Sequence, residues 1–141
     1  MTKREMILNA LFARLKTLDV VVKRNEIAPQ KIPASGLVIM RDGKQGVPEI
    51  LLSPPICLFN HEAAVEVIVQ AVKSEDRDRL LDELLEKIGE LVSSDKTLSG
   101  LTDFIYPKPP EIIEEYIEGA PLIKAAVIPV VLQYSTINPL K

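Results

Sequence analysis

Residues 56–72 read Ile-Cys-Leu-Phe-Asn-His-Glu-Ala-Ala-Val-Glu-Val-Ile-Val-Gln-Ala-Val, and their pattern is the clearest indication of the chain's architecture. In its second half, small apolar residues alternate with other side chains, so that Val65, Val67, Val69 and Ala71 are separated by Glu66, Ile68 and Gln70. A period of two is typical of a β-strand with one buried face. We therefore predict one long strand over residues 56–72, or two strands with a bend near Asn60.

The clearest helix follows this strand. Ser74 is its predicted N-cap, and Glu75, Asp76 and Asp78 fall in the first turn, where the helix dipole favours acidic side chains. One face is apolar and the other is charged. The apolar positions are Leu80, Leu81, Leu84, Leu85, Ile88, Leu91 and Val92.

A second helix is predicted near the start of the sequence, over residues 3–17. Thr2 and Glu5 have the spacing of a capping box, in which each side chain binds a free backbone N–H of the first turn. Apolar residues then recur at helical spacing at Leu8, Leu11, Leu15 and Leu18. We expect this stripe to face the core.

Shorter β-branched or apolar runs predict further strands at 20–22, 36–40, 49–52 and 124–136. Residues 41–46 contain Asp-Gly, which supplies the positive φ of a tight turn, and we predict a turn there. Pro129 has no N–H, so the last strand is expected to lie at an edge or to carry a bulge. The prolines at 107, 109 and 110 argue against a regular element. Residues 111–119 fit either a short helix or a loop.

The predicted order is α-β-β-β-β-α-β, without regular βαβ alternation. This order favours an α+β fold, in which a single mixed or antiparallel β-sheet has its two main helices packed on one face. A chain of 141 residues is long enough for one domain with a core, so we assign residues 1–141 to a single domain.

Composition narrows the function classes. The chain has three Phe, three Tyr and no Trp, so the core must consist mainly of Val, Ile and Leu. With so few aromatic side chains, we do not expect recognition of nucleic acid by stacking on bases. One cysteine excludes an internal disulfide and favours a reducing compartment. No apolar run is long enough to span a bilayer, and we find no secretory signal. We expect a soluble cytoplasmic product.

The sequence offers little for catalysis. His61 is the single histidine, and Cys57 is the single cysteine. Four residues apart in a strand, they share a face but lie about 13 Å apart, which is too far for proton transfer. The glycines match neither a Rossmann nor a P-loop pattern. We expect no catalytic residue, no metal site and no cofactor.

Charge is unevenly distributed. Residues 1–25 carry six basic and two acidic residues, a net charge of +4, which leaves −7 for the remainder of a chain whose net charge is −3. Such asymmetry either steers subunits together or reflects two solvated faces.

Several segments together resemble the tail terminator (tail completion) proteins of lambda-type phages, as carried by prophages and gene-transfer particles. The similar segments are residues 4–11 with Arg14 and Leu15, 22–25, 36–43, 64–69, 95–101 and 130–136. Three features are the most specific in combination. They are the strand before the acidic helix, the Asp-x-Thr-Leu-x-Gly-Leu segment at 95–101, and the late strand that ends in Tyr134-Ser135-Thr136. The resemblance covers nearly all of residues 3–139.

The resemblance implies a structural protein that caps the tail tube as a hexameric ring and forms the attachment surface for the head connector. Its implied partners are further copies of itself, the tail tube protein and the head-tail connector protein, with no membrane and no sequence-specific nucleic acid. It would act in the cytoplasm of a bacterial host and then in the virion tail. The alternative is another head-tail joining or virion adaptor module of similar fold.

A ring needs two different complementary patches on each subunit. The segment 41–46 is longer than a two-residue turn requires, which suggests a contact with a neighbouring subunit, although an idle loop is equally compatible with its length. The basic N-terminal quarter is a second candidate. The candidate interface residues are Arg41, Asp42, Gly43, Lys44, Gln45, Gly46, Arg14 and Arg24.

Overall fold

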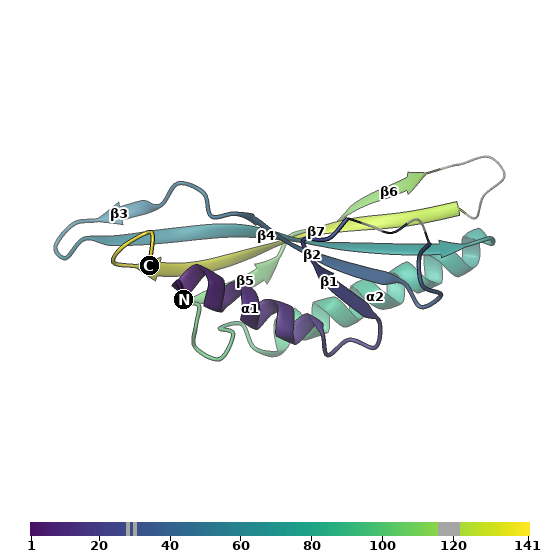
Figure 1. Cartoon of the computed structure of the whole chain (residues 1–141), viewed down its shortest axis with the longest axis horizontal. Helices are drawn as coiled ribbons and strands as arrows, with labels where there is room; N and C mark the ends of the chain where they lie inside the picture. Colours follow the sequence, from purple (N-terminus) through teal and green to yellow (C-terminus); the bar gives the residue numbers. More distant parts are fainter. Residues whose placement is uncertain (28, 30, 116–121) are drawn as a thin grey trace.

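The structure, a computed structural model, describes residues 1–27, 29, 31–115 and 122–141. Two helices and seven strands lie in these ranges. In chain order they are α1 (Lys3–Leu15), β1 (Val21–Arg24), β2 (Leu37–Lys44), β3 (Glu49–Leu51), β4 (Ile56–Ala71), α2 (Ser74–Ser94), β5 (Phe104–Pro107), β6 (Glu111–Glu115) and β7 (Leu122–Thr136). Figure 1 shows a long twisted sheet with both helices on one side of it.

The sheet is organised around two long central strands. β4 and β7 pair antiparallel from Cys57↔Thr136 to Ala71↔Leu122. The edge of β4 that does not face β7 pairs with β2 and, further along, with β3. In the same way, the outer edge of β7 pairs with β5 and then with β6. β1 joins the outer side of β2 in the sheet's parallel pair, and the described strands therefore form one mixed sheet.

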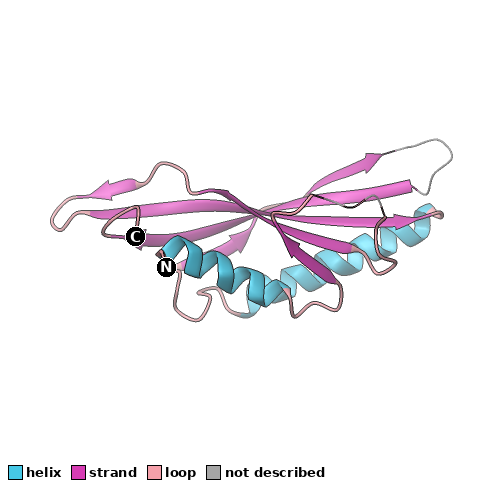
Figure 2. Ribbon diagram, in the orientation of Figure 1, coloured by secondary structure: helices cyan, strands magenta, loops and turns pink. Residues whose placement is uncertain are grey.

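Both helices pack on the same face of this sheet, as the sequence predicts (Figure 2). The buried positions of α1 are Ile7, Leu8, Leu11 and Leu15, and those of α2 include Leu81, Leu84, Ile88 and Val92. They cover the predicted apolar faces of β4 and β7, formed by Val65, Val67 and Val69 and by Ala126, Ile128, Val130, Leu132 and Tyr134. The α+β class with two main helices on one face is confirmed.

The helix ends differ slightly from the predictions. The Thr2 hydroxyl accepts the Glu5 backbone N–H at 3.1 Å, which is one half of the predicted capping box, and the Glu5 carboxylate binds Arg24 instead. Ser74, in contrast, is the first residue of α2, whose N-cap is Lys73 with no side-chain cap hydrogen bond. α1 ends at Leu15, two residues earlier than predicted.

The predicted turn at 41–46 is wrong. Residues 41–44 continue β2 along β4, with a shift of register between Arg41 and Lys44. Gly43 has a φ of +69° at this irregularity. The positive φ that an Asp-Gly pair supplies serves a β-bulge as well as a tight turn. The hairpin lies instead between β3 and β4, at residues 52–55.

The region after α2 also contains more β-structure than predicted. Residues 104–107 form β5, and residues 111–115 form β6, where a helix or a loop was expected. The prolines at 109 and 110 separate the two strands, both of which pair with β7 on one side. Residues 116–119 of the predicted segment lie outside the described residues.

Pro129 lies in a central strand, which neither expected alternative anticipated. It is paired with Ala64 of β4, and on its other side it faces the break between β5 and β6. Its carbonyl accepts the Lys108 N–H at 2.8 Å. Since the backbone N and C=O of one residue in an antiparallel strand point to the same side, the missing N–H falls at the break and β4 loses no bond.

The assignment of faces on α2 predicts two unequal substitutions. Leu84 is 3% exposed in the core, whereas Glu83 lies on the solvent side. Leu84→Asp is expected to lower the free energy of unfolding by about 4 kcal/mol or more, because an unpaired carboxylate must be buried. Glu83→Ala is expected to change it by about 0.5 kcal/mol. Urea denaturation measures both, and similar midpoints would show that the buried face is wrong.

Candidate interaction surfaces

The predicted interface residues do not form one surface. The structure places Arg24 and Asp42 together in a cluster beside α1, Arg41 on the sheet face away from the helices, and Arg14 at the far end of α1, against Asp95. Their role as contacts to other subunits stays a prediction. Their contacts within the chain are described below.

Arg24 joins three elements through its guanidinium group. It donates to Asp42 of β2 at 2.8 Å, and to Glu5 at 2.9 Å and Asn9 at 2.8 Å in α1. The hydrogen bonds to Asp42 and Glu5 raise the pKa of Arg24. Burial alone would raise the pKa of Asp42, but hydrogen bonds from Arg24 and Asn25 and the charge of Arg24 outweigh it and lower this pKa. These charges therefore stabilise the contact of α1 and β1 with β2.

Other residues of the 41–46 segment also contact their own chain. Arg41 pairs with Glu66 at 3.2 Å, and the Gln45 amide donates to the Tyr134 hydroxyl at 3.2 Å. A Cβ on Gly43 would lie 1.9 Å from the Glu62 carbonyl oxygen, so the backbone approach there requires glycine. Lys44 and Gly46 are exposed.

The Asp-x-Thr-Leu-x-Gly-Leu segment has a structural explanation. The Asp95 carboxylate accepts the N–H groups of Thr97 at 3.0 Å and Ser99 at 2.8 Å, and also the Thr97 hydroxyl at 2.9 Å. Leu98, Ser99 and Gly100 all have positive φ. The buried Leu98 side chain anchors this turn between α2 and β5 in the core.

Arg14 ties the same turn to α1. It donates to the Asp95 backbone carbonyl at 2.7 Å and to the Asp95 carboxylate at 3.2 Å. The backbone hydrogen bonds from Thr97 and Ser99, together with those from the Thr97 hydroxyl and Arg14, lower the pKa of Asp95. This segment, one of the three features that carry the resemblance, thus fixes a turn.

His61 is buried and fully hydrogen-bonded. Its Nε2 lies 2.6 Å from the Asp42 carbonyl oxygen and its Nδ1 lies 3.0 Å from the Tyr134 hydroxyl. Burial lowers the pKa of His61, so the ring is neutral at pH 7. A carbonyl can only accept, and Nε2 therefore carries the proton while Nδ1 accepts from Tyr134. Among the described residues, no group of three His, Cys, Asp or Glu side chains is placed to hold a metal ion.

The outer end of β3 and β4, residues 47–56, forms a projecting apolar surface that we call the hairpin tip. Its exposed side chains include Val47 (96% exposed), Ile50 (60%), Leu51 (45%) and Leu52 (79%). Ile50 pairs with Cys57 on the helix side of the sheet, and Leu51 pairs with Ile56 on the opposite side. Both faces of the hairpin tip are therefore apolar and uncovered, because it extends past both helices (Figure 1).

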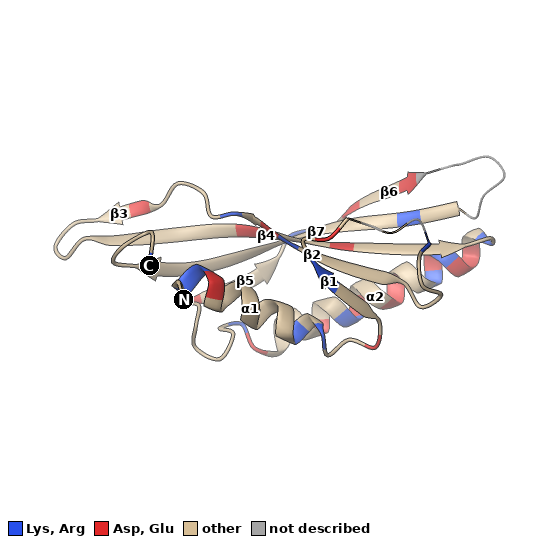
Figure 3. Ribbon diagram, viewed as in Figure 1, with Lys and Arg blue, Asp and Glu red and all other residues tan. Residues whose placement is uncertain are grey.

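The hairpin tip is also almost free of charge. Between Lys44 and His61, Glu49 is the single charged residue. Figure 3 shows this end of the molecule uncharged apart from the acidic residue in β3, while charged residues gather along α2 and near the middle of the sheet. An exposed apolar patch of this kind marks a contact surface more often than a solvated one.

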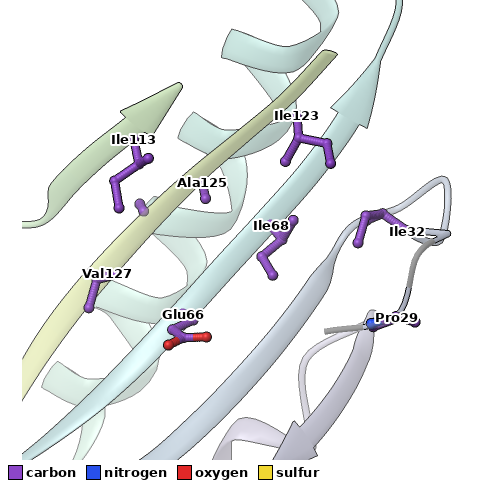
Figure 4. A pocket seen from close by; sticks show the side chains of 9 residues that line it. Pro29, Ile32, Glu66, Ile68, Ile113, Ile123, Ala125 and Val127 are labelled. Carbon is purple, nitrogen blue, oxygen red and sulfur yellow. The ribbon is translucent and has the colours of Figure 1, made fainter. Parts of the chain in front are cut away.

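A second apolar surface lies on the sheet face away from the helices, which we call the apolar groove. It has a volume of about 310 Å³. β4 and β7 form its floor, β6 forms one wall, and the segment before β2 forms the other (Figure 4). Its lining residues are Pro29, Ile32, Glu66, Ile68, Ile113, Ile123, Ala125, Ala126 and Val127.

Neither surface was anticipated from the sequence. The signal for the hairpin tip was the near absence of charge from residue 45 to 60, in a segment with consecutive apolar residues and no alternation. The groove gave no local signal, because its two walls come from segments that are far apart in the sequence.

Neither protein-family models nor curated proteins gave a match to this chain. No helix within the described ranges is both long and apolar enough to cross a membrane. What the chain does must therefore be argued from its own surfaces.

The hydrogen bonds of Asp95 predict a pH-dependent contribution to stability. Because the folded-state pKa is lowered, the contribution is present above the unfolded-state pKa of about 3.9 and is lost as the pH falls through the folded-state value. Asp95→Asn is expected to lower the melting temperature at pH 7, and the difference from wild type should shrink below about pH 4. Asp82→Asn, on the exposed side of α2, is the control. A pH-independent difference would contradict this origin.

Proposed function

We propose that the chain is a structural subunit that caps the tail tube of a phage or prophage particle as a closed ring and presents a surface to the head connector. It acts by shape rather than by catalysis. Its partners are further copies of itself, the tail tube protein and the connector protein, met first in the bacterial cytoplasm and then in the virion tail.

The observation that carries this proposal is the hairpin tip. It projects from the sheet with apolar side chains on both faces, and burying such side chains contributes about 25 cal/mol per Å². In a free monomer these apolar side chains would stay exposed to water, and the hairpin could aggregate edge to edge with other copies. A component of a larger assembly buries the surface on a neighbour.

The resemblance of residues 3–139 to tail terminator proteins points in the same direction. The elements that carry it include the strand β4 before the acidic helix α2, and β7 with its end at Tyr134-Ser135-Thr136. β4 and β7 are the two central strands of the sheet, and α2 packs on them. The alternative, a head-tail joining or virion adaptor module, would use the same exposed surfaces.

A tail-length experiment separates the two roles. Deleting the gene from the element that encodes it is expected to give over-long tails without heads, because tube polymerisation no longer stops. Electron microscopy of the particles measures this, and a plasmid copy of the wild-type chain should restore normal length.

Loss of an adaptor would instead leave tails of normal length without attached heads. That result would contradict the terminator role and support the alternative. In the restored particles, a ring of added density at the head-proximal end of the tail is expected.

A further inference from the structure

We propose that the hairpin tip of one copy of this chain docks in the apolar groove of the next copy, so that neighbouring copies join through two different surfaces. The inference rests on the proposed function, since it names the two surfaces through which neighbouring subunits would join. It also concerns a contact that can be measured on the purified chain without any tail.

The hairpin tip cannot fill the groove of its own chain. β3 pairs with residues 56–58 of β4, whereas Glu66 and Ile68 of the same strand lie in the groove floor. Ile56 and Glu66 are ten residues apart in this continuous strand, which corresponds to about 33 Å. The occupant must therefore come from another molecule.

The two surfaces are chemically complementary. The groove is lined mainly by aliphatic side chains, among them Ile68, Ile113 and Val127, and its volume suits a few side chains of this size. Leu51 and Leu52, on the exposed end of a narrow two-stranded hairpin, supply such side chains. Apolar side chains that leave water at both surfaces provide the favourable free energy.

The charges near the two surfaces favour one orientation of the contact. The hairpin tip carries one acidic residue, Glu49, and no basic residue. Lys31 is exposed next to Ile32 in the groove wall, and Arg41 pairs with Glu66 where Glu66 lines the groove. The β6 wall carries the exposed acids Glu111 and Glu114. Glu49 would therefore lie toward the wall with Lys31 and away from β6, which favours one orientation of docking.

The contact joins two different patches, so it is heterologous. Each copy would offer a hairpin tip to one neighbour and a groove to the other, and such contacts close into a ring when the rotation between neighbours is a whole fraction of a full turn. An isologous dimer, in which hairpin tip meets hairpin tip, would stop at two copies. The two arrangements therefore respond differently to substitutions.

Two single substitutions block one surface each. Leu52→Asp places a charge on the hairpin tip, and Ile113→Asp places one in the groove wall on β6. Both side chains are exposed, at 79% and 39%, so both variants should fold. Met6→Asp on α1 has an exposed fraction of 39% and lies outside both surfaces, which makes it the matched control. Melting temperatures within a few degrees of wild type establish that each variant is folded.

Sedimentation velocity then distinguishes the arrangements. Wild type and Met6→Asp are expected to form multi-subunit species, and each blocked variant alone is expected to be a monomer. An equimolar mixture of Leu52→Asp and Ile113→Asp should form a one-to-one dimer, because the intact hairpin tip of the second fits the intact groove of the first. The dimer cannot extend further.

Three results would overturn the inference. They are a monomeric wild type at every concentration tested, a mixture that stays monomeric, and an Ile113→Asp variant that associates as wild type does. These results leave the proposed function standing if gene deletion still gives over-long tails. Conversely, normal tails after deletion together with the one-to-one dimer would remove the tail role and keep the contact.

Discussion

The antiparallel pairing of β4 with β7 organises both the sheet and the core. In this pairing the apolar residues of the two long strands lie on the same face. That face of the two-stranded ribbon is therefore continuously apolar, and both helices pack on it. The two helices lie one after the other along this face, and neither reaches β3 (Figure 1). The end of the ribbon beyond α1 is therefore left uncovered, and that end is the hairpin tip.

Local periodicity explains which elements were predictable. The period of two in β4 and β7 and the helical period in α2 belong to the residues themselves, and the structure confirms these elements. Residues 41–44 and 111–115 form strands because β4 and β7 offer free backbone partners beside them. That information lies in the partner strand, so the same residues fit a turn, a loop or a short helix when they are read alone.

The candidate site was harder to predict than the fold, for a related reason. A count of charges locates Arg14 and Arg24 in a basic segment, but it does not identify the acidic groups that meet them in the fold. Arg24 pairs with Glu5 and Asp42, and Arg14 pairs with Asp95, all within the chain. The apolar hairpin tip left a trace in the sequence, namely a long stretch with one charge. Its exposure depends on where α1 and α2 end relative to β4.

The charged pairs lie within the chain and the apolar surfaces are exposed, and this difference bears on how an assembly of these chains would be held together. Ion pairs between exposed groups contribute little and are screened within about 10 Å at 0.1 M salt. Arg14 and Arg24 have side-chain exposures of 17% and 16%, and their partners lie on other elements of the same fold, so these charges stabilise the subunit. The surfaces left for neighbours are chiefly apolar. Under the proposed docking, apolar burial would supply the strength of the contact, while the charges of Glu49 and Lys31 would set its orientation.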